Sequence, residues 1–177
     1  MVWGVKQWVG LLARLVTGAV WIVAGAIKLP DPSGSIRAVR AYELLPESIV
    51  PMVGYALPVV EVVLGVCLVL GLLTRVMGVL SALLFVAFIV GISAAWARGL
   101  SIDCGCFGGG GQIEDATSKY PWEIARDVGL LLLSVRLAIW PRTRWSLDAV
   151  AFPPRAGESS PGSGEGEDWN VESGQGR

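Results

Sequence analysis

The chain has 177 residues, of which 53% are hydrophobic and only 16% are charged, and its mean hydropathy is +0.59. Soluble domains carry about 25% charged residues, so a water-soluble chain of this length could hardly cover so much apolar surface. The net charge of −1 offers no basic surface, and we predict no nucleic-acid partner. The sequence contains no histidine, which excludes histidine acid–base chemistry, Cys/His zinc sites and bis-histidine haem ligation, and we predict no metal site.

Four apolar runs are candidates for membrane-spanning helices. They cover residues 8–27, 49–73, 76–97 and 122–140. The first three contain at most one charged residue each, and about 20 helical residues cross the roughly 30 Å hydrocarbon core of a bilayer. The fourth run is weaker because it carries two acidic and two basic residues, and an interfacial helix is the alternative for it. We therefore predict an all-α fold, an integral membrane four-helix bundle, formed by one domain over residues 1–145.

The connecting segments differ in polarity and length. Residues 28–48 are too polar to enter lipid and include a predicted surface helix over residues 35–44. The link at residues 71–75 is short, so we expect the second and third spans to form an antiparallel hairpin. Residues 146–177 are rich in Gly, Ser, Pro and acidic residues, and we predict a disordered tail because they bury too little apolar area to offset the entropy of ordering.

The orientation in the membrane does not follow from charge. Lysine and arginine are divided almost equally between the two sides of a four-span arrangement, so the positive-inside rule does not decide. A cysteine pair that cycles through a disulfide fits the oxidising outer face better than the reducing cytosol. We therefore expect a multi-pass protein of the bacterial cell membrane, surrounded by membrane lipid, with cytoplasmic termini.

The segment after the third run carries the residues with redox chemistry. Cys104 and Cys106 are separated by Gly105 and followed by four glycines at 108–111. A disulfide across a single residue closes a small ring, and strained disulfides are the more oxidising and labile ones. Gly105 lacks the Cβ that would crowd such a turn. We predict that Cys104 and Cys106 are exposed catalytic residues at the outer face. The flanking Arg98 and Lys119 would favour a thiolate, and Asp103 would oppose it.

Three other interpretations of this pair remain open. The cysteines could be unreactive residues in a glycine-rich turn, half of a metal site completed by another chain, or a static structural disulfide. The third cysteine, Cys67, lies in the second run near the opposite face, where we interpret it as a small buried apolar residue.

Glu61 lies about ten residues from either end of the second run. An ionisable group at that depth is costly and marks a functional hypothesis, here proton handling coupled to thiol oxidation or to a bound quinone. A helix–helix ion pair or hydrogen bond is the alternative. Arg14 in the first run is the expected partner, and Lys28 is a second candidate that would approach from the outer end.

Several short motifs follow one another along the chain. They are Gly25-Ala26-Ile27-Lys28-Leu29 with Asp31-Pro32, then Tyr42-Glu43-Leu44-Leu45-Pro46, then Pro58-Val59-Val60-Glu61 with Gly65 and Leu70-Gly71, and finally Cys104-Gly105-Cys106-Phe107-Gly108. In this order, over about residues 8–140, the sequence resembles the MauE branch of the DoxX-like membrane proteins.

The resemblance implies a four-helix membrane protein linked to extracytoplasmic redox maturation. The named member of the family is associated with assembly of methylamine dehydrogenase, but nothing in this sequence indicates methylamine as a substrate. By resemblance, Cys104 and Cys106 would pass oxidising equivalents between an extracytoplasmic thioredoxin-like partner and the membrane. The residues do not identify the electron acceptor, for which a quinone is the hypothesis.

The sequence therefore favours a membrane thiol–disulfide redox protein that supports oxidative maturation of extracytoplasmic proteins, and its enzymatic class would be thiol–disulfide oxidoreductase. Two alternatives from other classes remain. One is a non-enzymatic membrane assembly or scaffold subunit of a respiratory or dehydrogenase complex. The other is a small-solute carrier that uses Glu61.

Overall fold

The computed structural model describes residues 2–105, 111–112 and 119–140, and within these residues the chain is mostly helical. The elements in chain order are α1 (Val2–Lys28), α2 (Pro32–Ala41), α3 (Val50–Leu70), α4 (Thr74–Ala97), β1 (Ile102–Asp103), β2 (Gly111–Gln112) and α5 (Tyr120–Ile139). The predicted tail at residues 146–177 lies outside the described residues.

Three of the described helices, α1, α3 and α4, are long and apolar enough to cross a membrane. Their outward-facing side chains are large and apolar, as contact with lipid requires; examples are Leu12, Val63 and Leu83. The prediction of a helical membrane protein is confirmed at this level. The 20-residue α5 does not belong to this apolar group, so the fourth membrane-spanning helix stays a prediction.

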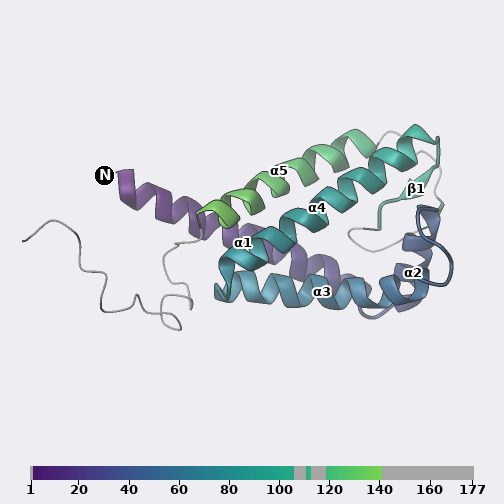
Figure 1. Ribbon diagram of the computed structural model, residues 1–177, viewed down its shortest axis with the longest axis horizontal. Helices are drawn as coiled ribbons and strands as arrows, with labels where there is room; N and C mark the ends of the chain where they lie inside the picture. Colours follow the sequence, from purple (N-terminus) through teal and green to yellow (C-terminus); the bar gives the residue numbers. More distant parts are fainter. Residues whose placement is uncertain (1, 106–110, 113–118, 141–177) are drawn as a thin grey trace, which may run out of the picture.

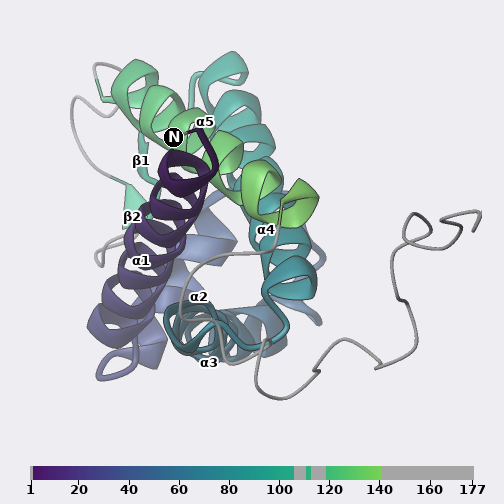
Figure 2. The ribbon, with the colours of Figure 1, turned by 90° about the vertical axis from the view of Figure 1, so that its left-hand side faces the viewer.

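The four long helices pack in two pairs, α1 against α3 and α4 against α5 (Figure 1). The beginning of α1, the turn between α3 and α4, and the end of α5 lie at one end of the bundle, which faces the viewer in Figure 2. The short helix α2 and the β1–β2 hairpin lie at the opposite end. The Cys-Gly-Cys segment thus begins at the end opposite to the start of α1.

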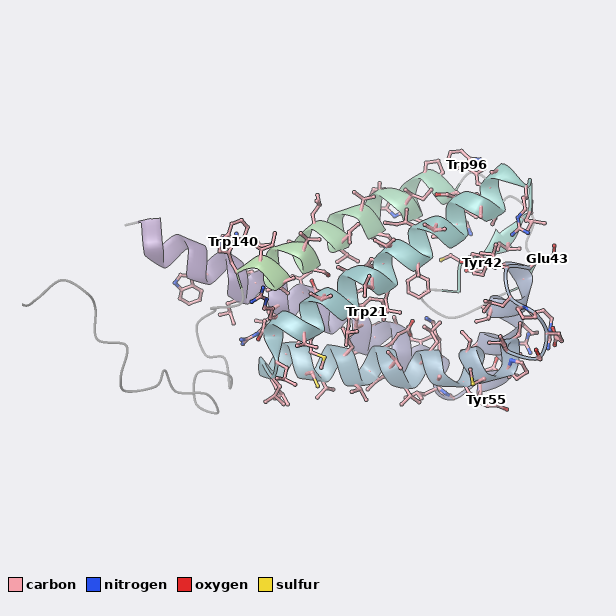
Figure 3. All side chains as sticks on the ribbon, viewed as in Figure 1. Trp21, Tyr42, Glu43, Tyr55, Trp96 and Trp140 are labelled. Atoms are coloured by element: carbon pink, nitrogen blue, oxygen red, sulfur yellow. The ribbon has the colours of Figure 1, made fainter. Side chains whose placement is uncertain are left out.

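Small residues and a buried series of hydrogen bonds hold the helices together. A Cβ on Gly65 would lie 2.7 Å from the backbone oxygen of Gly18, so α1 and α3 approach as closely as they do because both positions are glycine. Trp21 lies inside the bundle (Figure 3), and its indole N–H donates to the Ser81 hydroxyl over 2.7 Å. Ser81 in turn shares a 2.8 Å hydrogen bond with Ser134, which connects α1, α4 and α5.

The two connections predicted from the sequence are present. Gly71 ends α3 in the left-handed conformation with φ 72°, and the tight turn that follows makes α3 and α4 a hairpin. The surface helix α2 begins three residues before the predicted start, because Asp31 caps it and Pro32 occupies its first turn. The Asp31 carboxylate accepts the Gly34 N–H over 3.0 Å.

Candidate functional site

Cys104 lies where the hairpin meets the end of α4 and the beginning of α5. Strand β1 pairs antiparallel with β2, with Ile102 opposite Gln112, and so turns the chain back over the end of the bundle. The Cys104 side chain packs in one cluster with Ile102 and Tyr120 and is only 7% exposed. The prediction that both cysteines are exposed is therefore wrong for Cys104, and Cys106 lies outside the described residues.

Hydrogen bonds fix the backbone around Cys104. The Tyr42 hydroxyl, on the segment that follows α2, donates to the Cys104 carbonyl over 2.9 Å (Tyr42 is labelled in Figure 3). Gly105 has φ 65° in the left-handed region, which agrees with the prediction that this turn needs glycine, and its N–H donates to Asp103 over 3.0 Å. Arg98, which we expected to favour the thiolate, donates its hydrogen bonds to backbone carbonyls, one of them that of Tyr42.

Glu123 is a residue that the sequence analysis missed. It lies in the first turn of α5, and its carboxyl group lies near the Cys104 thiol. A carboxyl group near a thiol can exchange a proton with the sulfur when the sulfur reacts. An acidic residue in the first turn of a helix is ordinarily explained by its favourable interaction with the helix dipole, so its position in the sequence does not suggest a role beside Cys104.

Glu61 and Lys28 form a buried ion pair between α3 and α1. The Lys28 ammonium lies 2.7 and 2.9 Å from the two carboxylate oxygens of Glu61, and the side chains are 5% and 0% exposed. Of the two partners considered from the sequence, Lys28 is therefore correct and the preferred one, Arg14, is wrong. Arg14 is also buried on α1 but further toward its beginning.

The packing register of α1 on α3 explains this pairing. Gly25 faces Pro58 and Val62, which places Glu61 level with about residue 24 of α1, roughly 15 Å along the axis from Arg14. Helical side chains lean toward the beginning of their helix. Lys28, one turn beyond the level of Glu61, therefore reaches back to it, whereas the Arg14 side chain leans away.

A second pair of opposite charges faces the same interior space. Arg126 and Asp127 on α5 are joined over 2.9 Å, and Asp127 is 2% exposed. Glu61, Arg126 and Asp127 together line a small cavity of about 10 Å³ beside Trp21, about the space of one water molecule. Since Glu123 lies one helical turn before Asp127, acidic side chains extend from the Cys104 thiol to the Lys28–Glu61 pair.

A larger cavity brings Cys104 and Lys28 together. Its volume is about 310 Å³, and it lies between α2, α3 and α4, with Cys104 and Lys28 both in its lining. Two of the sequence-predicted site residues thus share one space, and a third, Glu61, contacts it through Lys28.

Comparison with known families covers the helices and cysteine segment just described. The model of one family, described as methylamine utilisation protein MauE, matches residues 6–141. The chain belongs to the MauE family. The match confirms the resemblance drawn from the short motifs and includes Lys28, Glu61 and Cys104. No curated protein and no solved structure matched the chain.

Proposed function

We propose that this MauE-family protein is a membrane thiol–disulfide redox protein that supports oxidative maturation of extracytoplasmic proteins through Cys104 and Cys106. The observation that carries the proposal is the place of Cys104 at one end of a bundle of apolar helices, where it lines a cavity together with Lys28 and lies near the Glu123 carboxyl group. Thiol–disulfide exchange proceeds through a thiolate, so a thiol beside a proton acceptor is suited to it. The partner in this proposal is a thioredoxin-like protein on the outer side of the membrane.

The proposed exchange transfers two electrons from the partner to the membrane protein. A thiolate of the partner's reduced pair attacks one sulfur of the Cys104–Cys106 disulfide, and the other sulfur leaves as a thiolate. The partner's second thiolate then attacks the mixed disulfide, which forms the partner's disulfide and leaves Cys104 and Cys106 reduced. In its protonated form the Glu123 carboxyl group gives a proton to the Cys104 sulfur when that sulfur leaves.

The proposal places the protein as a multi-pass protein of the bacterial cell membrane, with α5 as a fourth span and cytoplasmic termini. At 20 residues α5 is about 30 Å long, enough to cross the hydrocarbon core. Its buried Asp127 faces the interior, while Leu132 and Ile139 are exposed where lipid would surround the bundle. This distribution of charged and apolar side chains supports a span rather than a helix lying on the membrane surface.

The test follows the redox state of exported proteins in cells that carry single serine substitutions. Cys104→Ser and Cys106→Ser should each leave exported cysteines reduced, measured by trapping thiols with a maleimide that increases the protein mass. The same variants, each with one cysteine of the pair, should accumulate a mixed disulfide with an exported thioredoxin-like protein. Cys67→Ser is the matched control and should behave as the wild type. Cys67 lies near the C-terminal end of α3, at the end of the bundle opposite to Cys104.

Other outcomes would support the two alternatives. If the serine variants lose the assembly of a membrane complex while exported proteins stay oxidised, the protein is a scaffold and the redox proposal is wrong. If Glu61→Gln abolishes uptake of a solute and Cys104→Ser leaves uptake intact, the protein is a carrier.

A further inference from the structure

The cavity beside Cys104 has a mostly apolar lining with few polar groups. The residues that give it this character are Ala38, Val39, Val53, Leu57, Leu84 and Phe88, from α2, α3 and α4. The polar side chains in the lining are those of Lys28, Ser35, Tyr42 and Cys104. Ligand sites for small molecules have this composition, an apolar space with a few placed polar groups, and this volume of about 310 Å³ lies at their lower limit.

We infer that this cavity binds the ring of a lipid-soluble quinone, which accepts the two electrons released when Cys104 and Cys106 form their disulfide. The inference rests on the proposed function and adds the chemical class of the electron acceptor and the place where it binds.

The chemistry of reoxidation defines what the acceptor must be. When the two thiols become one disulfide, an S–S bond forms, two S–H bonds break, and two electrons and two protons are released. A quinone takes up two electrons and two protons and becomes a quinol, so the reaction balances without another reactant. The cavity lies among apolar helices, and a quinone that is dissolved in lipid would reach it from the membrane.

Lys28 gives the cavity a feature that a ring oxygen would use. An ammonium group has three N–H donors, and two of those of Lys28 are directed at the Glu61 oxygens, over 2.7 and 2.9 Å. The remaining donor and the positive charge favour an oxygen on which negative charge develops during reduction. The acyl chain of a phospholipid would fill the apolar part of the cavity but has no group for this ammonium.

Phe88 lies close to both the Lys28 ammonium and the cluster that contains Cys104. Its ring centroid lies 5.8 Å from the Lys28 ammonium, and its side chain packs against the cluster that contains Cys104. A planar ring in this cavity would therefore lie against an aromatic side chain, with the thiol and the ammonium in the same lining.

Binding is tested first without redox chemistry. The full-length Cys104→Ser/Cys106→Ser variant is placed in phosphatidylcholine nanodiscs and titrated with decylubiquinone, and quenching of tryptophan fluorescence is recorded. We expect saturable quenching. Ala87→Phe, added in the cavity lining on α4, should weaken the apparent affinity about tenfold, which corresponds to about 1.4 kcal/mol. Val90→Phe, on the exposed side of the same helix, is the control and should bind as its parent.

A second variant guards against misfolding of Ala87→Phe. Lys28→Met combined with Glu61→Gln removes the ammonium without leaving a lone charge, and it should also bind about tenfold more weakly, by about 1.4 kcal/mol. If quenching is unsaturable, or if the control loses as much affinity as the cavity variant, the quinone site is refuted. Equal competition by added phospholipid would mean that the cavity holds a lipid only, which also overturns the inference.

Electron transfer is tested with the reduced wild-type protein and the same quinone. One equivalent of quinol should form while both cysteines lose their reactivity toward maleimide, and Ala87→Phe should slow both changes. Saturable binding without quinol formation would refute the role of the quinone as acceptor. Diamide, a small thiol oxidant, distinguishes failure of the proposed function from failure of the quinone inference. If diamide cannot convert the two cysteines into a disulfide, the proposed function is contradicted. If diamide oxidises them and the quinone does not, only the quinone inference is contradicted.

Discussion

Replacing Lys28 with methionine is the most direct test of the buried ion pair. Methionine keeps most of the length and apolar volume of the lysine stem but removes the ammonium that lies 2.7 and 2.9 Å from the Glu61 oxygens. Glu61 has no exposed surface, so its carboxyl group would remain in the apolar interior without its cation. Removing one partner of a buried pair costs about 3–5 kcal/mol of folding free energy, and we expect a loss in this range.

The rest of the chain supplies controls for this magnitude. Arg37 and Asp31 form an exposed pair at 3.3 Å, with side chains 56% and 58% exposed, so Arg37→Met should change the stability only slightly. The double variant Lys28→Met/Glu61→Gln removes both charges together. It should be much closer to the wild type than Lys28→Met alone, because a pair without charges carries a smaller desolvation cost.

Stability is measured by titrating each variant in mixed micelles with sodium dodecyl sulfate and following helix content by circular dichroism. The three variants and the wild type form a comparison in which only Lys28→Met should unfold at a clearly lower denaturant fraction. The reasoning would be refuted if Lys28→Met were no less stable than Arg37→Met. It would also be refuted if the double variant were as unstable as the single one, because the loss would then come from packing rather than from the unpaired carboxyl group.

Three further predictions concern other parts of the molecule. Glu123→Gln removes the carboxyl group that would accept the Cys104 proton and should slow alkylation of Cys104 by iodoacetamide at neutral pH; an unchanged rate contradicts this role of Glu123. Gly65→Leu should destabilise the detergent-solubilised protein by about 1–3 kcal/mol, since a Cβ there would meet backbone of α1 at 2.7 Å. Gly129→Leu, where a Cβ meets nothing within 4 Å, should not, and equal losses would contradict the close packing. Hydrogen bonds from a neighbouring serine hydroxyl and from a backbone N–H in the first turn of α2 hold the pKa of Asp31 below its ordinary 3.8. The ionised Asp31 therefore caps α2 at and above pH 3.8, and the cap is lost only as the pH falls through the lowered pKa. The first-turn amides should therefore still be protected from hydrogen exchange at pH 3.8, and they should lose protection at every pH in Asp31→Ala.

The long helices could be predicted because apolar composition over about 20 residues is a local property of the sequence. The helix α2 begins three residues before the predicted start, where Asp31 and Pro32 form a cap and a first turn that the apolar pattern does not mark. The β1–β2 hairpin was not predicted. Each strand has two residues, which is too short for an alternating pattern of apolar and polar residues to reveal it.

Site residues could be predicted where a single residue is unusual in its surroundings. They could not be predicted where the relevant feature is the proximity of two residues that are distant in the sequence. Glu61 and Cys104 were identified because an acid within an apolar run and a cysteine in a glycine-rich loop are unusual on their own. The partner of Glu61 depends on the register of α1 on α3, which close glycine packing sets and hydropathy does not reveal. Glu123 is 19 residues from Cys104, and no local pattern in the sequence relates the two residues.

The buried charges argue for chemistry rather than for a scaffold. Well-packed apolar residues of similar volume can replace a buried ion pair at little or no cost in stability, so a helix bundle that only holds a complex together has no need of Glu61 and Lys28. In the proposed redox function they have a use, because oxidation of the Cys104–Cys106 dithiol releases two protons. Glu123 lies near the thiol, Asp127 follows one turn later on α5, and Asp127 and Glu61 line the same small cavity. We therefore expect the Lys28→Met/Glu61→Gln protein to fold and to keep cysteines that diamide can oxidise, but no longer to support the oxidation of exported proteins. A fully active double variant would contradict a functional role of the buried ion pair.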